Sequence, residues 1–371
     1  MLWIKKIEGR FNITRGGKLR KHLGADYKWK RDENQEAYIE VWMERKRQDI
    51  IDSFEKLRGK PCKIRKTPAS PGSVLRKNEG EVVNIEQYRS MVGKIMFYAT
   101  KVSPKIVNTT RELATHMGNP NEDHWKMMEH LVGYIKGTLG QPSMILRKPK
   151  ELRCVSYVDA SYANSADCRK SVSGELHTVG GMITSFSSRS QRTISMSSAE
   201  SEYIAASAAA QEIMFQQILL SEIAVTVVPA AIFEDNSGAI FLSRNKQVSQ
   251  RTKHIDLRYH FLRDFTAKKD GKAARGIMLK VDGKNNYADL MTKNTDGQTF
   301  NHLGEDIDKG MKRLREETYE EYVVQQLGGM SAVMTYEVDE HISSLNTWIR
   351  YVRKKTNYDN SMIEKDSVMK G

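Results

Sequence analysis

The chain has 371 residues and a mass of 42.4 kDa, more than one ordinary hydrophobic core accommodates, so we expect about two or three compact units. Hydrophobic residues make up 39% and aromatic residues 8%, which excludes global disorder, and no apolar stretch approaches the ~18 residues of a membrane span. No apolar segment typical of a secretory signal follows the first residues. The 3 cysteines are far apart and form no CxxC pair, which favours a reducing, intracellular compartment over a disulfide scaffold or zinc ribbon.

The net charge of +13 is unevenly distributed along the chain. Residues 1–80 carry 21 Lys/Arg against 11 Asp/Glu, whereas residues 151–300 carry 18 against 16. This distribution indicates a polyanionic ligand. The basic first part would guide the polyanion, and the nearly neutral block would process it. For the charge excess alone, an ordinary solvated surface is an equally good explanation.

The first 150 residues are predicted to be mainly helical. Residues 32–60 have the spacing of a charged helix, and the Pro/Gly/Ser cluster at 66–73 indicates a linker. Helical spacing returns from residue 85 to residue 139, with breaks predicted at Ser103-Pro104 and at Gly118–Pro120. This pattern predicts a unit of roughly three helices.

From residue 152 the pattern changes to alternating strands and helices. Strands are predicted at 152–160, 173–179, 182–187, 230–233 and 277–281. Helices are predicted at 199–223, just after 238, at 254–269 and at 287–292. This order predicts an α/β fold with a mixed β-sheet flanked by helices, whereas residues 301–371 carry no motif that can be assigned.

Four acidic residues lie at element boundaries in the 151–300 block. They are Asp159 in an otherwise apolar strand, Glu200 at the start of the long helix, Asp235 at the end of the short strand, and Asp289 at the last helix. Glu200 is on the stripe that continues through Ile204 and Ala208, so its side chain should face the sheet. Several inward-facing carboxylates repel one another unless cations lie between them.

Each acid also has an ordinary structural explanation. Glu200 fits the third position of a capping box that begins at Ser197. Asp235 and Asp289 could be acids favoured by the dipole at a helix start, and Asp159 could face water on an edge strand.

Several motifs in fixed order resemble the ribonuclease H domain of copia-type LTR retrotransposon Pol polyproteins. They are Tyr157–Asn164 (YVDASYAN), Arg169–Ser171 with Gly174, Ser197–Tyr203 (SSAESEY), Glu234–Ala239 (EDNSGA), Lys253–His260 (KHIDLRYH) and Ala288–Lys293 (ADLMTK). The upstream part resembles the end of the reverse-transcriptase palm and the thumb and connection of the same polyprotein. The motifs there are Gly17–Leu19 with Leu23-Gly24, Tyr88–Lys94, His124-Trp125 and Tyr134–Thr138.

The resemblance implies an α/β ribonuclease H-like mixed sheet, preceded by a mostly helical reverse-transcriptase thumb/connection remnant. It divides the chain into a palm remnant with a charged helix (1–65), a thumb/connection-like helical unit (66–150), a ribonuclease H domain (151–300) and an unassigned tail (301–371).

By motif position, Asp159, Glu200, Asp235 and Asp289 match the four catalytic, metal-binding acids of that family. The expected cofactor is a pair of Mg²⁺ ions, with Mn²⁺ as a substitute, because hard cations prefer carboxylate oxygens.

The implied activity is endonucleolytic hydrolysis of the RNA strand of RNA–DNA hybrids during reverse transcription. Candidate residues for holding the nucleic acid are Arg169, Lys170, Arg189 and Arg192, for which a solvated surface is an equally good explanation. Other Pol or Gag components are candidate partners, no membrane contact is expected, and the expected location is intracellular, in cytoplasmic virus-like particles or the nucleus.

Two departures from the family bear on this interpretation. The polymerase needs an aromatic-x-Asp-Asp motif, and this chain contains no Asp-Asp pair, so no polymerase activity is expected. The loop Asp282–Asn286 also lacks the His that some relatives carry before the last acid. The alternative function is a catalytically inactive, nucleic-acid-binding remnant of a retrotransposon. Integrase-type strand transfer is a weaker alternative, because no His/Cys zinc-ligand spacing is present.

Overall fold

The structure is a computed structural model that describes residues 17–149, 152–222, 229–244, 256–267, 274–312 and 314. The chain divides into two compact units, Met1–Arg315 and Glu316–Gly371, and all the described residues belong to the first. The divisions expected at residues 65, 150 and 300 stay predictions. None of the described helices is long and apolar enough to cross a membrane.

The first part contains a small antiparallel sheet that the sequence did not predict. Its strands, in the order β1-β2-β3-β4, are β1 (Lys21–His22), β2 (Ala25–Arg31), β3 (Ala37–Trp42) and β4 (Met144–Arg147). The helix predicted at 32–60 is therefore wrong in its first part, because α2 (Glu44–Arg58) begins only after β3. Tyr38, Ile39, Val41 and Trp42 are aromatic and β-branched residues, which pack well on a pleated surface.

The helices of the first part agree with the sequence pattern. They are α3 (Ile85–Val102), the short 3₁₀ helix η1 (Pro104–Ile106), α4 (Val107–Thr115) and α5 (Glu122–Gly137). Both predicted breaks are confirmed. Trp125 is buried against Phe54 and Tyr88, with ring centroids 5.7 and 5.5 Å apart, so it belongs to the core of this part.

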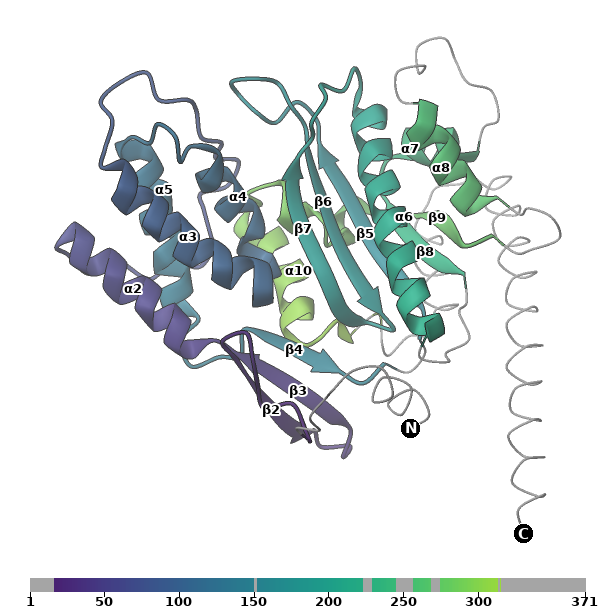
Figure 1. Cartoon of the computed structure of the whole chain (residues 1–371), viewed down its shortest axis with the longest axis horizontal. Helices are drawn as coiled ribbons and strands as arrows, with labels where there is room; N and C mark the ends of the chain where they lie inside the picture. Colours follow the sequence, from purple (N-terminus) through teal and green to yellow (C-terminus); the bar gives the residue numbers. More distant parts are fainter. Residues whose placement is uncertain are drawn as a thin grey trace, which may run out of the picture. The chain divides into compact units, whose positions relative to one another are not determined.

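The second sheet has five strands in the order β7-β6-β5-β8-β9 (Figure 1). The strands are β5 (Cys154–Ser161), β6 (Val172–Val179), β7 (Met182–Ser190), β8 (Ala230–Glu234) and β9 (Gly276–Lys280). Strands β7, β6 and β5 pair antiparallel, while β5, β8 and β9 run parallel. The expected α/β class with a mixed β-sheet flanked by helices is confirmed.

Helices cover both faces of this sheet. They are α6 (Ser198–Glu222), α7 (Ser237–Arg244), α8 (Asp256–Thr266), α9 (Asp289–Thr292) and α10 (Gly297–Asp308). Helix α6 lies across one face (Figure 1), where Tyr203 and Ala206 join Val158 and Ile232 in a buried apolar cluster. On the other face, the ring of Tyr157 stacks on Phe233, with centroids 5.1 Å apart.

Asn294 links the first part to the chain that follows α9. Its Oδ1 accepts hydrogen bonds from Asn108 Nδ2 (3.2 Å) and Thr109 Oγ1 (2.9 Å) on α4. Its Nδ2 donates to the carbonyl oxygen of Ser73 (2.8 Å) and to Glu112 Oε2 (3.2 Å). The helices of the first part therefore support the segment that carries α9.

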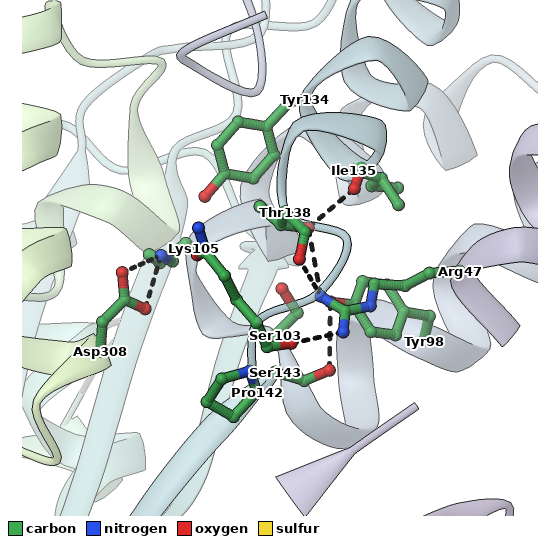
Figure 2. A pocket seen from close by; sticks show the side chains of 11 residues that line it. Arg47, Tyr98, Ser103, Lys105, Tyr134, Ile135, Thr138, Pro142, Ser143 and Asp308 are labelled. Carbon is green, nitrogen blue, oxygen red and sulfur yellow. Dashed lines mark hydrogen bonds and ion pairs between the residues drawn. The ribbon is translucent and has the colours of Figure 1, made fainter. Parts of the chain in front are cut away.

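A small cavity lies where α2, α3, η1, α5 and α10 meet, and Figure 2 shows its lining. Its volume of about 20 Å³ has room for roughly one water molecule. Arg47, fully buried, donates to the carbonyl oxygen of Thr138 (2.6 Å), while Lys105 donates to Asp308 (2.6 Å). None of the four predicted acids lines this cavity.

Two glycines in helices allow a matched test of the first part. A methyl group on Gly133 of α5 would overlap the backbone carbonyl oxygen of Lys63, whereas one on Gly93 of α3 would meet nothing within 4 Å. We expect Gly133→Ala to lower the free energy of unfolding by ~1–3 kcal/mol through overpacking. Gly93→Ala should raise it by ~0.5–1 kcal/mol, because alanine loses less backbone entropy in a helix. Denaturant titration of the full chain measures both, and equal effects would contradict the packing of α5 on residues 63–65.

Candidate metal centre

Three of the four predicted acids come together at one end of the second sheet. One carboxylate oxygen each from Asp159, Asp235 and Asp289 lie within 4.8 Å of one another. Strands β5 and β8 are parallel, and Tyr157 pairs with Phe233, so Asp159 and Asp235 follow at equivalent places on neighbouring strands. Their carboxylates therefore meet where the parallel strands end, the edge at which such sheets present their sites.

A close approach of α9 to β6 brings Asp289 to the same place. A Cβ atom on Gly174 of β6 would lie 2.6 Å from Thr292 Cγ2 and 2.8 Å from the carbonyl oxygen of Ala288. Only glycine leaves room for α9 at this distance. The Asn286 side chain, just before α9, donates to the carbonyl oxygen of Val158 on β5 (2.8 Å) and fixes the approach from the other side.

The structure does not bring Glu200 into this group. Glu200 Oε2 accepts a hydrogen bond from the Met196 N–H (2.8 Å), and the Glu200 N–H donates to Ser197 Oγ (3.2 Å). This pattern resembles the capping box that is the ordinary structural explanation for Glu200. Glu202 instead reaches the acidic centre, in a second group with Glu234 and Asp235. Residues two apart on a helix point about 200° away from each other, so only one of Glu200 and Glu202 can face the centre.

The sequence pattern could not choose between these two glutamates. Almost every residue in the first part of α6 is buried, from Glu200 through Ala210, so apolar residues occur on all sides of the helix there. The stripe through Ile204 therefore carried no directional information. Glu234 was missed for another reason, because a fully buried acid inside a short apolar strand gives no periodic signal.

Four acids of the two groups, Glu202, Glu234, Asp235 and Asp289, have raised pKa values. Burial, reinforced by Glu234 and Asp159, raises the pKa of Glu202 to about 11. Burial also raises the pKa of Glu234 and of Asp235, and together with Asp159 it raises the pKa of Asp289 to about 7. In each case desolvation disfavours the charged form, and neighbouring carboxylates add repulsion.

Lys293 supplies positive charge on one side of the centre. Its Nζ lies 2.8 Å from Asp289 Oδ1 and 3.4 Å from Asp159 Oδ1. Burial alone would lower the pKa of Lys293, but Asp159 and Asp289 raise it above its ordinary value. The Thr292 hydroxyl also donates to Asp159 Oδ2. Asp159 and Asp289 are thus held in place by their own neighbours.

The donor set fits a hard divalent cation. Among the residues described, Glu202 Oε2 and Glu234 Oε2 are buried and accept no hydrogen bond, apart from the contact between the carboxyl groups of Glu234 and Asp235. Buried carboxylate oxygens without a donor are costly unless a cation or proton neutralises them. A site built only of carboxylate oxygens favours Mg²⁺ or Mn²⁺ over softer metals.

The four residues expected to hold nucleic acid lie on the surface near β6 and β7. Arg169 and Lys170 belong to the loop between β5 and β6, while Arg189 lies near the end of β7 and Arg192 follows that strand. Arg169, Arg189 and Arg192 are exposed, and Lys170 is half-buried. Their contact with nucleic acid stays a prediction.

The chain is similar in sequence to segments of known polyproteins. Over 268 residues the chain is 30% identical to the "Retrovirus-related Pol polyprotein from transposon TNT 1-94" of Nicotiana tabacum, covering 70% of this chain and 19% of the relative. It is 28% identical over 261 residues to the corresponding protein from transposon RE2 of Arabidopsis thaliana, covering 70% of this chain and 17% of that protein. The chain thus spans less than a fifth of the length of these relatives. No protein-family model matches the chain.

Among solved structures, LC11-RNase H1, isolated from compost, matches 43% of this chain and 99% of its own. Its sequence identity to this chain is 12%, and the TM-score is 0.30.

The raised acid pKa values predict how stability depends on pH without metal. The folded state keeps the proton of Asp289 up to about pH 7, whereas the unfolded chain releases it near 3.8. Because the folded state then binds more protons, the free energy of unfolding falls as pH rises between these values. In EDTA we expect the melting temperature to fall from about pH 5 to about pH 8, and Mg²⁺ should reduce that fall.

Calorimetry with Asp289→Asn as the control variant checks this prediction. The variant lacks the titrating carboxyl and should show a smaller loss of stability with pH. A melting temperature that rises over the same pH range in EDTA, or a wild type whose slope Mg²⁺ leaves unchanged, would contradict the proximity of the acids.

Proposed function

We propose that this chain, which is similar to a segment of the retrovirus-related Pol polyproteins of transposons, hydrolyses the RNA strand of RNA–DNA hybrids as a metal-dependent endonuclease. The observation that carries this proposal is the meeting of Asp159, Asp235 and Asp289 with Glu202 nearby. In this proposal the chain acts as the ribonuclease H-type unit of a retrotransposon Pol during reverse transcription.

Asp159, Glu202, Asp235 and Asp289 would hold a pair of Mg²⁺ ions, or Mn²⁺ in their place. Glu202 takes the role that the motif position suggested for Glu200. When bound, paired divalent ions activate a water molecule and stabilise the leaving oxygen of a phosphodiester. The products are a 3′-hydroxyl and a 5′-phosphate.

The chain's own residues orient this centre before substrate binds. Thr292 and Lys293 fix the carboxylate of Asp159, and Lys293 also holds that of Asp289. The side chain of Lys293 is 42% exposed, so its ammonium can also face a phosphate oxygen of a bound backbone. Such preorganised charge is effective in catalysis because the residues need not reorganise during the reaction.

The hybrid would be held mainly through its phosphates. Residues 1–80 carry most of the chain's net positive charge. Beside the second sheet lie Arg169, Lys170, Arg189 and Arg192. RNA is distinguished from DNA by contacts to its 2′-hydroxyls across the wide minor groove. Residues 1–65 and 66–150 would act as palm and thumb/connection remnants that guide the hybrid.

The expected setting is a retrotransposon particle inside the cell, in the cytoplasm or nucleus, with other Pol or Gag components as partners. No polymerase activity is proposed for this chain, because it contains no Asp-Asp pair. A protein that binds hybrids without cutting them is the alternative, and it is an outcome of the experiment below.

The central test is cleavage of a hybrid labelled on its RNA strand, with Mg²⁺ and the purified chain. Asp235 belongs to both carboxylate groups, so Asp235→Asn should slow cleavage by ~100-fold or more while leaving hybrid binding measurable. Binding without cleavage in the wild type would favour the inactive remnant. Equal cleavage by wild type and variant would contradict the proposed site.

A second pair of variants separates the two glutamates of α6. Glu202→Gln should slow cleavage by ~100-fold or more, because it removes a carboxylate from the centre. Glu200→Gln should reduce it less than ~10-fold, because Glu200 accepts a backbone N–H at the start of α6. The opposite ranking in initial rates would restore the assignment made from motif position.

A further inference from the structure

Glu234 is a fully buried carboxylate on the side of the sheet that α6 covers. Its neighbour Phe233 packs on Tyr157, on the other face. Side chains alternate along a strand, so Glu234 and Ile232 point toward α6, and Ile232 joins the apolar cluster there. Glu234 is 0% exposed and Glu202 is 4% exposed.

These two carboxylates have unpartnered oxygens that are more than nine-tenths buried. Glu234 Oε1 accepts the N–H of Asn236 (2.9 Å). In the part of the chain that the structure describes, Glu234 Oε2 and Glu202 Oε2 accept no hydrogen bond, apart from the contact between the carboxyl groups of Glu234 and Asp235. Lys293 makes its ion pairs with Asp159 and Asp289, the acids of the other group. The Glu202–Glu234 side of the centre is therefore the side without an ion-paired lysine or arginine among the described residues.

The distances suit a small cation. One oxygen each from Glu202, Glu234 and Asp235 lie within 4.8 Å of one another. With Mg²⁺–O bonds of about 2.1 Å, ligand oxygens are ~3.0 Å apart in cis positions and ~4.2 Å apart in trans positions, so side-chain rotations that move the oxygens by about an ångström would bring all three onto one ion. Because all three donors are carboxylate oxygens, the occupant is a hard divalent cation.

We propose that Glu234 is a metal ligand, and that Glu202, Glu234 and Asp235 form a cation site that shares Asp235 with the Asp159–Asp235–Asp289 site. This inference deepens the proposed function and rests on it for the use of both ions in catalysis. It assigns the two ions to opposite sides of Asp235, one beside α9 and one beneath α6. Glu234 is then a fifth metal-binding acid, in addition to the four proposed above to hold the two Mg²⁺ ions.

Metal titration of the full chain without nucleic acid tests this assignment. Calorimetry with Mg²⁺, and spin-resonance counting of bound Mn²⁺, give the number of ions and their dissociation constants. Wild type should bind two ions. Glu234→Gln, which keeps the shape and removes the charge, should weaken one ion at least ~10-fold and leave the other within ~3-fold, since ligand charge count sets affinity.

Matched variants identify which ion is affected. Glu202→Gln should weaken the same ion as Glu234→Gln, so the double variant should lose little more than either single one. Asp289→Asn should weaken the other ion, and Asp235→Asn should weaken both. Glu200→Gln removes an equal charge from the same helix and should leave both ions bound.

Two results would overturn the proposal. One is a Glu234→Gln variant that binds both ions as wild type does, and the other is a wild type that binds a single ion which Glu234→Gln leaves unchanged. Circular dichroism checks folding, and if Glu234→Gln does not fold, Glu234→Asp and Glu202→Gln decide by the same criterion. Two bound ions in a wild type that does not cut hybrids would support this metal assignment and contradict the proposed function.

Discussion

Like charges forced together in a buried place are the constraint on which this structure depends. Strands β5 and β8 run parallel, so Asp159 and Asp235 end up side by side, and α9 and α6 add Asp289 and Glu202. Repulsion and desolvation make this arrangement unfavourable for the fold alone. Protons held by the acids with raised pKa values and the ammonium of Lys293 offset part of this cost, and divalent cations would offset it further.

The rest of the molecule holds these acids in position. Gly174 lets α9 approach β6, and Asn294 ties the chain after α9 to α4 and to Ser73. The helices of the first part are therefore a support for the acidic centre. A metal site needs such support, because carboxylates that can move apart under repulsion do not hold a cation in one geometry.

Much of this arrangement could be predicted from the sequence, and the failures have physical causes. The hairpin that joins the strands predicted at 173–179 and 182–187 was predictable, because Gly180-Gly181 suits a two-residue turn, and both glycines adopt the positive φ (55° and 80°) of a type I′ turn. The strand at Ala37–Trp42 was missed because it leads directly into the charged α2 and shares its mixture of apolar and charged residues. Glu202 was missed because α6 is buried around its circumference, and Glu234 because a buried acid beside a strand end has no pattern of its own.

The most direct measurement is an anomalous diffraction map of crystals soaked in Mn²⁺. The account predicts two manganese peaks on either side of Asp235, one near Asp159 and Asp289 and the other near Glu202 and Glu234. Side chains of these five residues turned toward solvent, or manganese bound only elsewhere on the chain, would contradict it.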